Sequence, residues 1–224
     1  MNDSVIKISN VVKEYHTGSV AVRALNGISL NVEKGELIAI TGRSGSGKST
    51  LMHIIGCLDR ATSGSYFLDN IDVNSLSSNQ LAEIRNTKIG FVFQSFNLLP
   101  YLSAFGNVEL PMIFAGVDKN LRENKVRELL NIVGMDKRAS HKPTEMSGGE
   151  QQRIAIARAL ANDPEIILAD EPTGNLDSKI GDSIMELFIS LWKSGKTIIM
   201  ITHDPKVANL CPKKIELLDG KIKN

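Results

Sequence analysis

The strongest chemical signal in the sequence is a glycine-rich loop that ends in a lysine and two hydroxyl residues. Its members are Gly42, Arg43, Ser44, Gly45, Ser46, Gly47, Lys48, Ser49 and Thr50. The glycines allow the backbone to approach a polyphosphate closely, so that successive N–H groups and a helix start face the anion. The lysine then supplies a charge for the β and γ phosphates, and the Ser49 hydroxyl supplies a ligand for Mg²⁺.

The segments on either side of this loop have the pattern that its chemistry requires. The apolar run 37–40 predicts a buried strand before the loop, and the apolar periodicity of 51–57 predicts a helix after it. A glycine-rich turn that binds nothing is the alternative, but strand, lysine, hydroxyl and helix follow in the order of a phosphate-binding turn. We therefore expect the loop to bind a nucleoside triphosphate.

Two carboxylates follow another buried segment. The apolar residues 166–169 predict a strand, and Asp170 and Glu171 come directly after them. A buried parallel strand would deliver both side chains to the sheet edge where open α/β sheets bind ligands. We expect Asp170 to hold Mg²⁺, directly or through water, and Glu171 to act as base or polariser for an attacking water. The alternative is that the two carboxylates merely close a strand.

A third apolar run, 197–201, ends at Thr202 and His203. A lone histidine is more often structural, but this is the third strand end with polar chemistry, which favours a γ-phosphate contact for His203. In the predicted first sheet, Tyr15 is the one aromatic residue that could stack on a nucleotide base. Its position alone is equally consistent with an ordinary tyrosine on a strand face.

Residues 147–150 predict the start of a helix. Ser147 and Glu150 have the spacing of a capping box, with Gly148 and Gly149 between them. Each glycine there destabilises a helix by up to ~1 kcal/mol relative to alanine, yet glycines allow an anion to approach the positive helix end. The helix start is therefore a second candidate phosphate site, although a well-capped helix alone has the same pattern. Asp177 is placed to cap a later helix.

Composition limits the classes of protein that fit. The chain has 224 residues, 42% hydrophobic and 23% charged, as expected for one large α/β domain or a core with a smaller lobe. A net charge of +1 gives no basic footprint for nucleic acid. No apolar run approaches the ~20 residues that span a bilayer, and the first residues lack the features of a signal peptide, so we expect a cytosolic location. Cys57 and Cys211 are expected to be reduced structural thiols.

The pattern along the chain predicts three parts in a single domain, 1–224. Residues 5–33 suggest short strands joined by turns. From Ser103 to about Asp136 strand signals vanish and apolar residues recur at the spacing of one helix face. We therefore expect an α/β core with a β subdomain, formed by 1–94 and 151–224, into which a helical lobe, 95–150, is inserted.

Taken together, these motifs resemble the ATP-binding cassette (ABC) ATPases over nearly the whole chain. The loop at 42–49 is similar to the family's Walker A, residues 146–150 to its signature, and 168–171 to its Walker B with the following catalytic glutamate. Gln94 is similar to the Q-loop glutamine, 175–177 to the D-loop, His203 to the switch histidine and Tyr15 to the adenine-stacking aromatic. The signature run at 147–153 is the most specific of these, although Met146 and Glu150 depart from the usual Leu-Ser-Gly-Gly-Gln. The resemblance implies a P-loop NTPase (RecA-like) core with an N-terminal antiparallel β subdomain and an inserted α-helical subdomain.

The resemblance also implies a mechanism. ATP and Mg²⁺ are the expected cofactors, with Ser49, Gln94 and Asp170 at the metal and with Glu171, His203 and Gln94 as catalytic residues. A head-to-tail homodimer would enclose each ATP between the Walker A loop of one chain and Ser147, Gly148, Gly149 and Asp177 of the other. Two phosphate-binding helix starts need not meet on one ligand within a chain, whereas a two-fold pair gives each ATP one of each.

Finer features, at 54–60, 93–100 and 170–177, are similar to the macrolide-exporter and lipoprotein-releasing branch. That branch implies a separate transmembrane permease, an adaptor in the periplasm or at the surface, and a place on the cytoplasmic face of the membrane. The permease would dock in a groove near residues 94–108. The alternative is an ABC ATPase of a non-transport complex, such as a cell-division complex; a phosphate-loop kinase or simple nucleotide-binding module leaves 147–153 unexplained.

Overall fold

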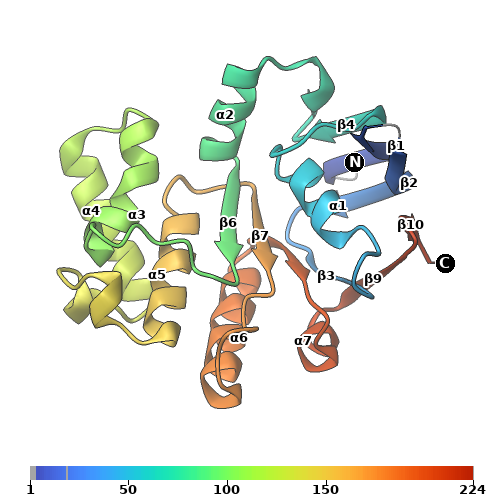
Figure 1. Ribbon diagram of the computed structural model, residues 1–224. Coiled ribbons are helices and arrows are strands. Elements are labelled where there is room, and N and C mark those ends of the chain that lie inside the picture. Colours follow the sequence, from blue (N-terminus) through green and yellow to red (C-terminus); the bar gives the residue numbers. More distant parts are fainter. Residues whose placement is uncertain (1–3, 19, 224) are drawn as a thin grey trace.

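The computed structural model describes residues 4–18 and 20–223, which form two β-sheets and a set of helices (Figure 1). The larger sheet has six strands in the order β10-β9-β3-β8-β7-β6, and only β10 is antiparallel to its neighbour. Its strands are β3 (Leu37–Gly42), β6 (Ile89–Phe93), β7 (Ile166–Asp170), β8 (Thr197–Ile201), β9 (Lys213–Leu218) and β10 (Lys221–Ile222).

Both faces of this sheet are buried, which explains the continuous apolar runs in its sequence. Successive residues of a strand point to opposite faces, and the core divides accordingly. One hydrophobic cluster contains Leu37, Ala39, Ile167, Ala169, Ile198 and Met200. The other cluster contains Ile38, Ile40, Ile166, Leu168, Ile199 and Ile201.

The smaller sheet is antiparallel, with the order β2-β1-β4-β5. Its strands are β1 (Ser4–Thr17), β2 (Val20–Glu33), β4 (Ser63–Leu68) and β5 (Ile71–Asp72). The expectation of short strands over residues 5–33 is wrong, because β1 and β2 are long. Register shifts, including one between Ile8 and Val11, interrupt the alternation, and Asn10 has a φ of 50°. Such bulges break the sequence pattern while the strand continues.

Helices pack on both faces of the larger sheet. They are α1 (Lys48–Ile55), α2 (Ser78–Thr87), α3 (Ala104–Phe114), α4 (Lys119–Ile132), α5 (Gly148–Ala159), α6 (Ser178–Lys193) and α7 (Pro205–Leu210), with 3-10 turns at Val73–Ser75, Asp136–Arg138 and Pro143–Glu145. Figure 1 shows α1 and the antiparallel sheet at one end of the molecule, and α3 and α4 at the other. Across residues 4–18 and 20–223, none of the helices is long and apolar enough to cross a bilayer. The mixed α/β fold expected from the sequence is confirmed.

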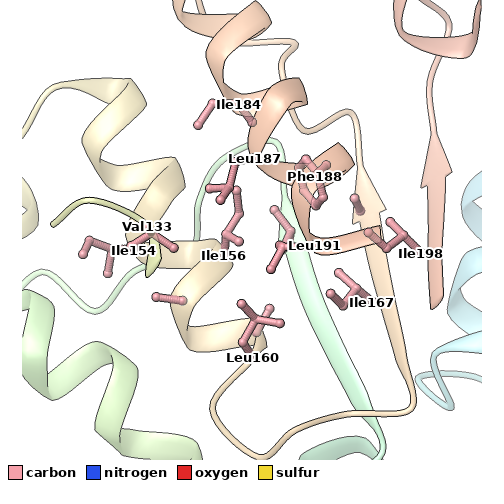
Figure 2. Packing of buried hydrophobic residues seen from close by; sticks show 14 of the residues in the cluster. Val133, Ile154, Ile156, Leu160, Ile167, Ile184, Leu187, Phe188, Leu191 and Ile198 are labelled. Atoms are coloured by element: carbon pink, nitrogen blue, oxygen red, sulfur yellow. The ribbon is translucent and has the colours of Figure 1, made fainter. Parts of the chain in front are cut away.

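Helices α5 and α6 are joined to the larger sheet by one apolar cluster (Figure 2). Ile154 and Ile156 of α5, Phe188 of α6, and Ile167 and Ile198 of the sheet are all at most 1% exposed. This packing holds the start of α5 in a fixed relation to the strands β7 and β8. The ends of these strands and the start of that helix therefore have fixed positions relative to one another.

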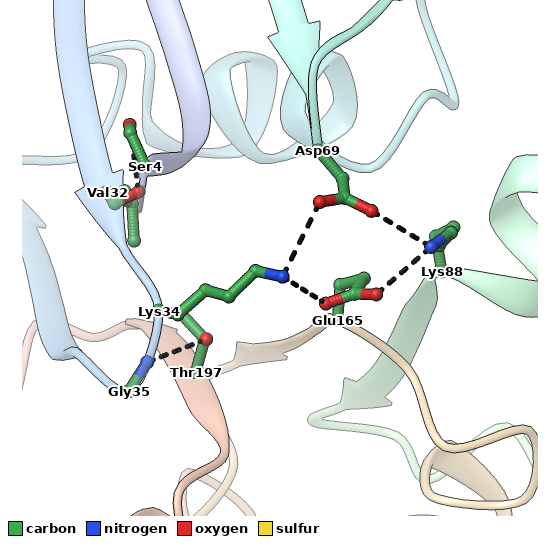
Figure 3. A network of polar contacts seen from close by, with 8 residues as sticks. All are labelled: Ser4, Val32, Lys34, Gly35, Asp69, Lys88, Glu165 and Thr197. Atoms are coloured by element: carbon green, nitrogen blue, oxygen red, sulfur yellow. Dashed lines mark hydrogen bonds and ion pairs between the residues drawn. The ribbon is translucent and has the colours of Figure 1, made fainter. Parts of the chain in front are cut away.

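A ring of four charges ties the two sheets together at the amino ends of β6 and β7 (Figure 3). Lys88 Nζ lies 3.0 Å from both an oxygen of Asp69 and an oxygen of Glu165, and Lys34 Nζ lies 3.6 and 3.5 Å from the remaining oxygens. Asp69 follows β4 of the smaller sheet, whereas Lys88 and Glu165 precede strands of the larger one. The ring thus braces the sheet edge opposite to the phosphate-binding loop.

A glycine in β6 marks a close contact that can be tested. A Cβ atom at Gly90 would lie 2.3 Å from the carbonyl oxygen of Ala159, so Gly90→Ala must push α5 away from the sheet. We expect a loss of about 1–3 kcal/mol in the free energy of unfolding, measured by urea denaturation. Gly106→Ala is the control: its Cβ would meet its nearest neighbour at 3.4 Å within a helix, so its stability should be unchanged or up to ~1 kcal/mol higher. Equal stability of the two variants would contradict the packing described.

Candidate nucleotide-binding site

The glycine-rich loop connects β3 to α1 and has the backbone that its glycines permit. Gly42 and Gly47 have φ values of 148° and 102°, and Gly47 is the N-cap residue of α1. A Cβ atom on Gly42 would lie 2.4 Å from the carbonyl oxygen of Leu217, and one on Gly47 2.6 Å from that of Ala24. Glycine is therefore required by both conformation and space. The loop places N–H groups and the start of α1 at the carboxyl end of β3, as the sequence predicted.

Lys48 points back over its own loop. Its Nζ donates hydrogen bonds of 2.8 Å to the carbonyl oxygens of Gly42 and Arg43. The ammonium also acts electrostatically on the Asp170 carboxylate and the His203 imidazole, where it opposes stronger effects that raise the pKa of both groups overall. The lysine, the end of β7 and the end of β8 thus lie close together, as expected from parallel strands with a common carboxyl edge.

Strand register explains which side chains meet there. Phe93, Asp170 and Ile201 are paired across β6, β7 and β8, so the three chains leave the sheet side by side. Gln94, Glu171 and Thr202 are the residues that follow these three positions.

Asp170 fits the role of a cation ligand. Burial, followed by repulsion from Glu171, raises the pKa of its carboxyl, while His53 and Lys48 act in the opposite direction. A divalent cation beside Asp170 would offset both unfavourable effects. Within the described ranges no group of three or more His, Cys, Asp or Glu residues could hold a metal by itself.

Glu171 is held by three donors from the segment after β8. Its Oε1 lies 2.6 Å from His203 Nδ1 and accepts a 3.0 Å bond from the His203 backbone N–H. Its Oε2 accepts a 3.2 Å bond from the Thr202 hydroxyl. Glu171 itself has a φ of 45°, a value that few non-glycine residues adopt. The carboxylate is therefore fixed in orientation, facing the imidazole.

Gln94 is bound to the loop after β7. Its Nε2 donates a 3.1 Å bond to Asn175 Oδ1, and Asn175 Nδ2 donates a 3.0 Å bond to the Gln94 carbonyl oxygen. This pair of bonds connects the two segments that the sequence identified as similar to the Q-loop and the D-loop. Gln94 is exposed and lies beside Gly174, on the same edge of the sheet as Glu171.

Tyr15 lies on β1 beside the end of the glycine-rich loop. Its side chain is close enough to Thr50 for that hydroxyl to lower the tyrosine pKa, although burial and a hydrogen bond to Asp59 raise it overall. The residue is 39% exposed. An exposed aromatic ring near the helix that begins at the phosphate loop is a suitable platform for a nucleotide base.

The start of α5 has the predicted capping box. Ser147 Oγ accepts from the Glu150 N–H at 3.3 Å, and Glu150 Oε2 accepts from the Ser147 N–H at 2.8 Å. Gly149 is buried, and a Cβ atom there would lie 2.5 Å from Ile180 of α6. Close packing on α6 is thus a reason for this glycine that the sequence did not reveal. Asp177 caps α6 as predicted, through a 3.0 Å bond from the Ile180 N–H.

The sequence did not predict several of the contacts at the site. Thr202 is hydrogen-bonded to Glu171, and Asn175 to Gln94. His53 acts electrostatically against the rise in the pKa of Asp170, and Asp59 accepts a hydrogen bond from Tyr15. A polar residue directly after a buried strand is the one available signal, and it applies to Thr202. The others lie on loops or a helix surface, where their partners depend on the fold.

The contact between Glu171 and His203 predicts a pH effect with a definite sign. The hydrogen bond and the negative charge raise the pKa of His203 above its ordinary 6.5. A raised pKa in the folded state means that this contact stabilises the fold fully below pH 6.5 and is lost as pH rises through the raised pKa. We expect NMR titration of the imidazole to give a pKa above 6.5, and Glu171→Gln to bring it back toward that value. An imidazole that titrates identically in both proteins would contradict the contact.

Comparison with known proteins agrees with the geometry. Residues 25–174 match the ABC transporter family. The chain is 52% identical over 218 residues to an uncharacterised ABC transporter ATP-binding protein of Thermotoga maritima, covering 97% of this chain and 93% of that protein. It is 47% identical over 222 residues to the macrolide export ATP-binding/permease protein MacB of Vibrio parahaemolyticus, covering 99% of this chain but 34% of MacB.

Solved structures give the same result. The fold matches the ATP-binding cassette MJ0796 of Methanocaldococcus jannaschii with a TM-score of 0.89 and 48% identity, covering 98% of this chain and 97% of that one. That structure is a dimeric post-hydrolysis state bound to ADP and Pi. The cbiO1 protein of Clostridium perfringens, part of the ABC transporter complex cbiONQ, matches with a TM-score of 0.89 at 28% identity, covering 99% of this chain and 88% of that one. The resemblance inferred from the motifs is confirmed: the chain is an ATP-binding cassette of the ABC transporter family.

Proposed function

We propose that the chain hydrolyses ATP and that Glu171 is the residue that activates the attacking water. The observation that carries this proposal is the pairing of Glu171 with His203 at the edge of the sheet that holds the glycine-rich loop. A carboxylate held in a fixed orientation near a phosphate-binding loop is suited to accept or polarise a water proton. His203, which contacts the same carboxylate, would in addition contact the γ-phosphate.

The remaining residues of the site bind and orient the nucleotide. Residues 42–50 would enclose the phosphates with backbone N–H groups, and Lys48 would exchange its loop carbonyl partners for phosphate oxygens. Ser49, Asp170 and Gln94 would hold Mg²⁺. When bound, Mg²⁺ offsets phosphate charge and orients the β and γ phosphates. Tyr15 would stack on the adenine ring.

We further propose that ATP joins two copies of the chain head to tail. The start of α1 and the start of α5 lie far apart in Figure 1, so one nucleotide is not reached by both helix starts of the same chain. In a two-fold pair, Ser147, Gly148 and Gly149 of one chain would meet the ATP held by the loop of the other, with Asp177 at the contact between them. The dimeric ADP-bound relative supports this arrangement.

A separate transmembrane permease is the proposed partner of this dimer. The MacB relatives are named as combined ATP-binding and permease proteins, and the present chain spans about a third of their length. The proposed docking groove includes residues 94–108. A pocket adjoins that segment between α2, β6, α3 and α5, and its lining includes Phe91, Asn97 and Arg158. Hydrolysis at the cytoplasmic face of the membrane would then drive export or mechanical work. An adaptor in the periplasm or at the surface is a further proposed partner, and nucleic acid is not.

We also propose boundaries for the subdomains. We assign 1–94 and 151–224 to the α/β core with its β subdomain, and 95–150 to the helical subdomain. The run of helices between β6 and β7 supports this division.

Substitution of the proposed base separates binding from hydrolysis. Glu171→Gln keeps the shape of the side chain but cannot accept a proton, so we expect kcat to fall about 10²–10⁴-fold while ATP binding is retained. Lys48→Ala should instead weaken ATP binding itself, because the positive charge that would contact the phosphates is removed. Steady-state phosphate release and a nucleotide-binding titration measure the two quantities. Unchanged turnover in Glu171→Gln would remove this residue from the proposed role.

Association in the presence of ATP tests the second helix start. Light scattering on the Glu171→Gln protein should show mainly monomer without nucleotide and dimer with Mg-ATP. Adding Ser147→Arg places a long cationic side chain where the phosphates of the other chain's ATP are expected, and we expect the ATP-dependent dimer to disappear. Thr144→Arg is the matched control, since Thr144 is exposed and lies outside the capping box. Dimerisation of the Ser147→Arg variant at the same ATP concentration would refute the head-to-tail arrangement.

A further inference from the structure

The ring of Tyr15 is held by two side chains that belong to none of the nucleotide-binding motifs. We propose that Asp59 and Lys13 are positioning residues that fix this ring so that one face is presented to the nucleotide base. The inference rests on the proposed function, in which Tyr15 stacks on the base, and deepens it by assigning the residues that prepare the stacking surface.

Asp59 bridges two residues of β1. Its Oδ2 accepts a 2.9 Å hydrogen bond from the Tyr15 hydroxyl, and its Oδ1 lies 2.6 Å from Lys13 Nζ. The backbone N–H of Arg60 donates to the same Oδ1 at 2.7 Å. Burial acts to raise the pKa of Asp59, but these three donors lower it overall, so the carboxylate stays charged. Because Asp59 lies in the loop after α1, it connects the candidate base platform to the helix that begins at the phosphate loop.

Lys13 covers the ring from one side. It is two residues from Tyr15 on the same strand, and its Nζ lies 4.8 Å from the centroid of the ring, as in a cation–π contact. The ammonium also donates to the carbonyl oxygen of Arg60 at 2.9 Å, and its side chain is only 12% exposed. Carboxylate, carbonyl and ring together account for the directions in which an ammonium donates. A base can therefore approach Tyr15 only on the face that Lys13 does not cover.

The physical benefit is preorganisation. A half-exposed tyrosine that is free to rotate would lose side-chain entropy when a base stacks on it, and that loss weakens binding. With the hydroxyl bound to Asp59 and one face against Lys13, the ring has little freedom left to lose. The effect should appear in nucleotide affinity and not in the chemical step, which takes place at the phosphates.

A purely structural role makes a different prediction. If the three side chains only attach β1 to the loop after α1, removing Asp59 would lower stability and disturb the neighbouring phosphate loop. All ligands of that loop would then bind more weakly, whether or not they carry a base. A ligand without a base therefore distinguishes the two roles.

The experiment is isothermal titration calorimetry of Asp59→Ala with two probes, Mg-ADP and inorganic pyrophosphate. We expect ADP affinity to fall between about two- and tenfold, the range produced by losing one hydrogen bond, with pyrophosphate affinity unchanged. In steady-state assays KM for ATP should rise by the same factor at constant kcat. Glu14→Gln is the matched control, because Glu14 lies between the two residues on β1 and pairs with Arg23 of β2 instead. It should leave all these values unchanged.

A double-mutant cycle tests the tether directly. Tyr15→Phe keeps the ring and removes only the hydroxyl that bonds to Asp59. We expect it to reproduce part of the loss in ADP affinity, and the double variant Tyr15→Phe with Asp59→Ala to bind ADP no more weakly than Asp59→Ala alone. Fully additive losses would show that the two residues act separately, contrary to the inference.

Other outcomes separate this inference from the proposed function. If Tyr15→Ala weakens ADP binding but Asp59→Ala does not, Tyr15 remains the base platform and the positioning role of Asp59 is wrong. If Asp59→Ala weakens ADP and pyrophosphate equally, its effect passes through the phosphate loop and the inference fails. If Tyr15→Ala binds ADP as the wild type does, the stacking assignment itself fails, while the tests of Lys48 and Glu171 still decide ATP hydrolysis.

Discussion

The burial of the larger sheet on both faces is the constraint on which the rest of the structure depends. Because neighbouring residues of β3, β7 and β8 belong to different hydrophobic clusters, a shift of one residue in any strand would exchange its two faces. The register is therefore fixed by packing. That register is also what brings the residues after Phe93, Asp170 and Ile201 together at one edge. Core packing and site geometry are thus consequences of the same alternation.

At this edge the chain orders the proposed catalytic groups through contacts between distant segments. Glu171 is held by residues more than thirty positions away in sequence, and Gln94 is bound by Asn175 across the same edge. Both oxygens of this carboxylate accept hydrogen bonds, which fixes the orientation of the proposed base. The Lys48 ammonium is likewise held by two carbonyl oxygens of its own loop.

Much of this arrangement could be predicted from the sequence, because the relevant signals are local. A buried strand followed by glycines and lysine, or by two carboxylates, identifies both the strand and the chemistry at its end, and the capping box at Ser147 identifies a helix start. The length of β1 could not be predicted, since a bulge at Asn10 breaks the alternation. Helix α2 was also missed. Its one buried residue is Leu81, so its apolar pattern is weak, although Ser77 and Gln80 do form a capping box.

The contacts of the site residues could not be predicted from the sequence for a different reason. The contact of Gly149 with Ile180, and that of Tyr15 with Asp59, join segments whose distance in space depends on the complete fold. The sequence pattern around Gly149 indicates only that an anion could approach the helix start. The tight packing of this glycine against α6 depends on the tertiary structure. A motif shows which chemistry is present, whereas the residues that orient it are selected by the tertiary structure.

The four-charge ring of Lys34, Asp69, Lys88 and Glu165 has a consequence for how this sequence can vary. Each ammonium contacts both carboxylates, so replacing one residue by a neutral one leaves an excess charge shared among the other three. Substitutions at these positions are therefore best tolerated as balanced pairs, one acid together with one base. Among related chains, the four positions should change together across the boundary between the two sheets, although Lys34 and Glu165 lie far apart in the sequence.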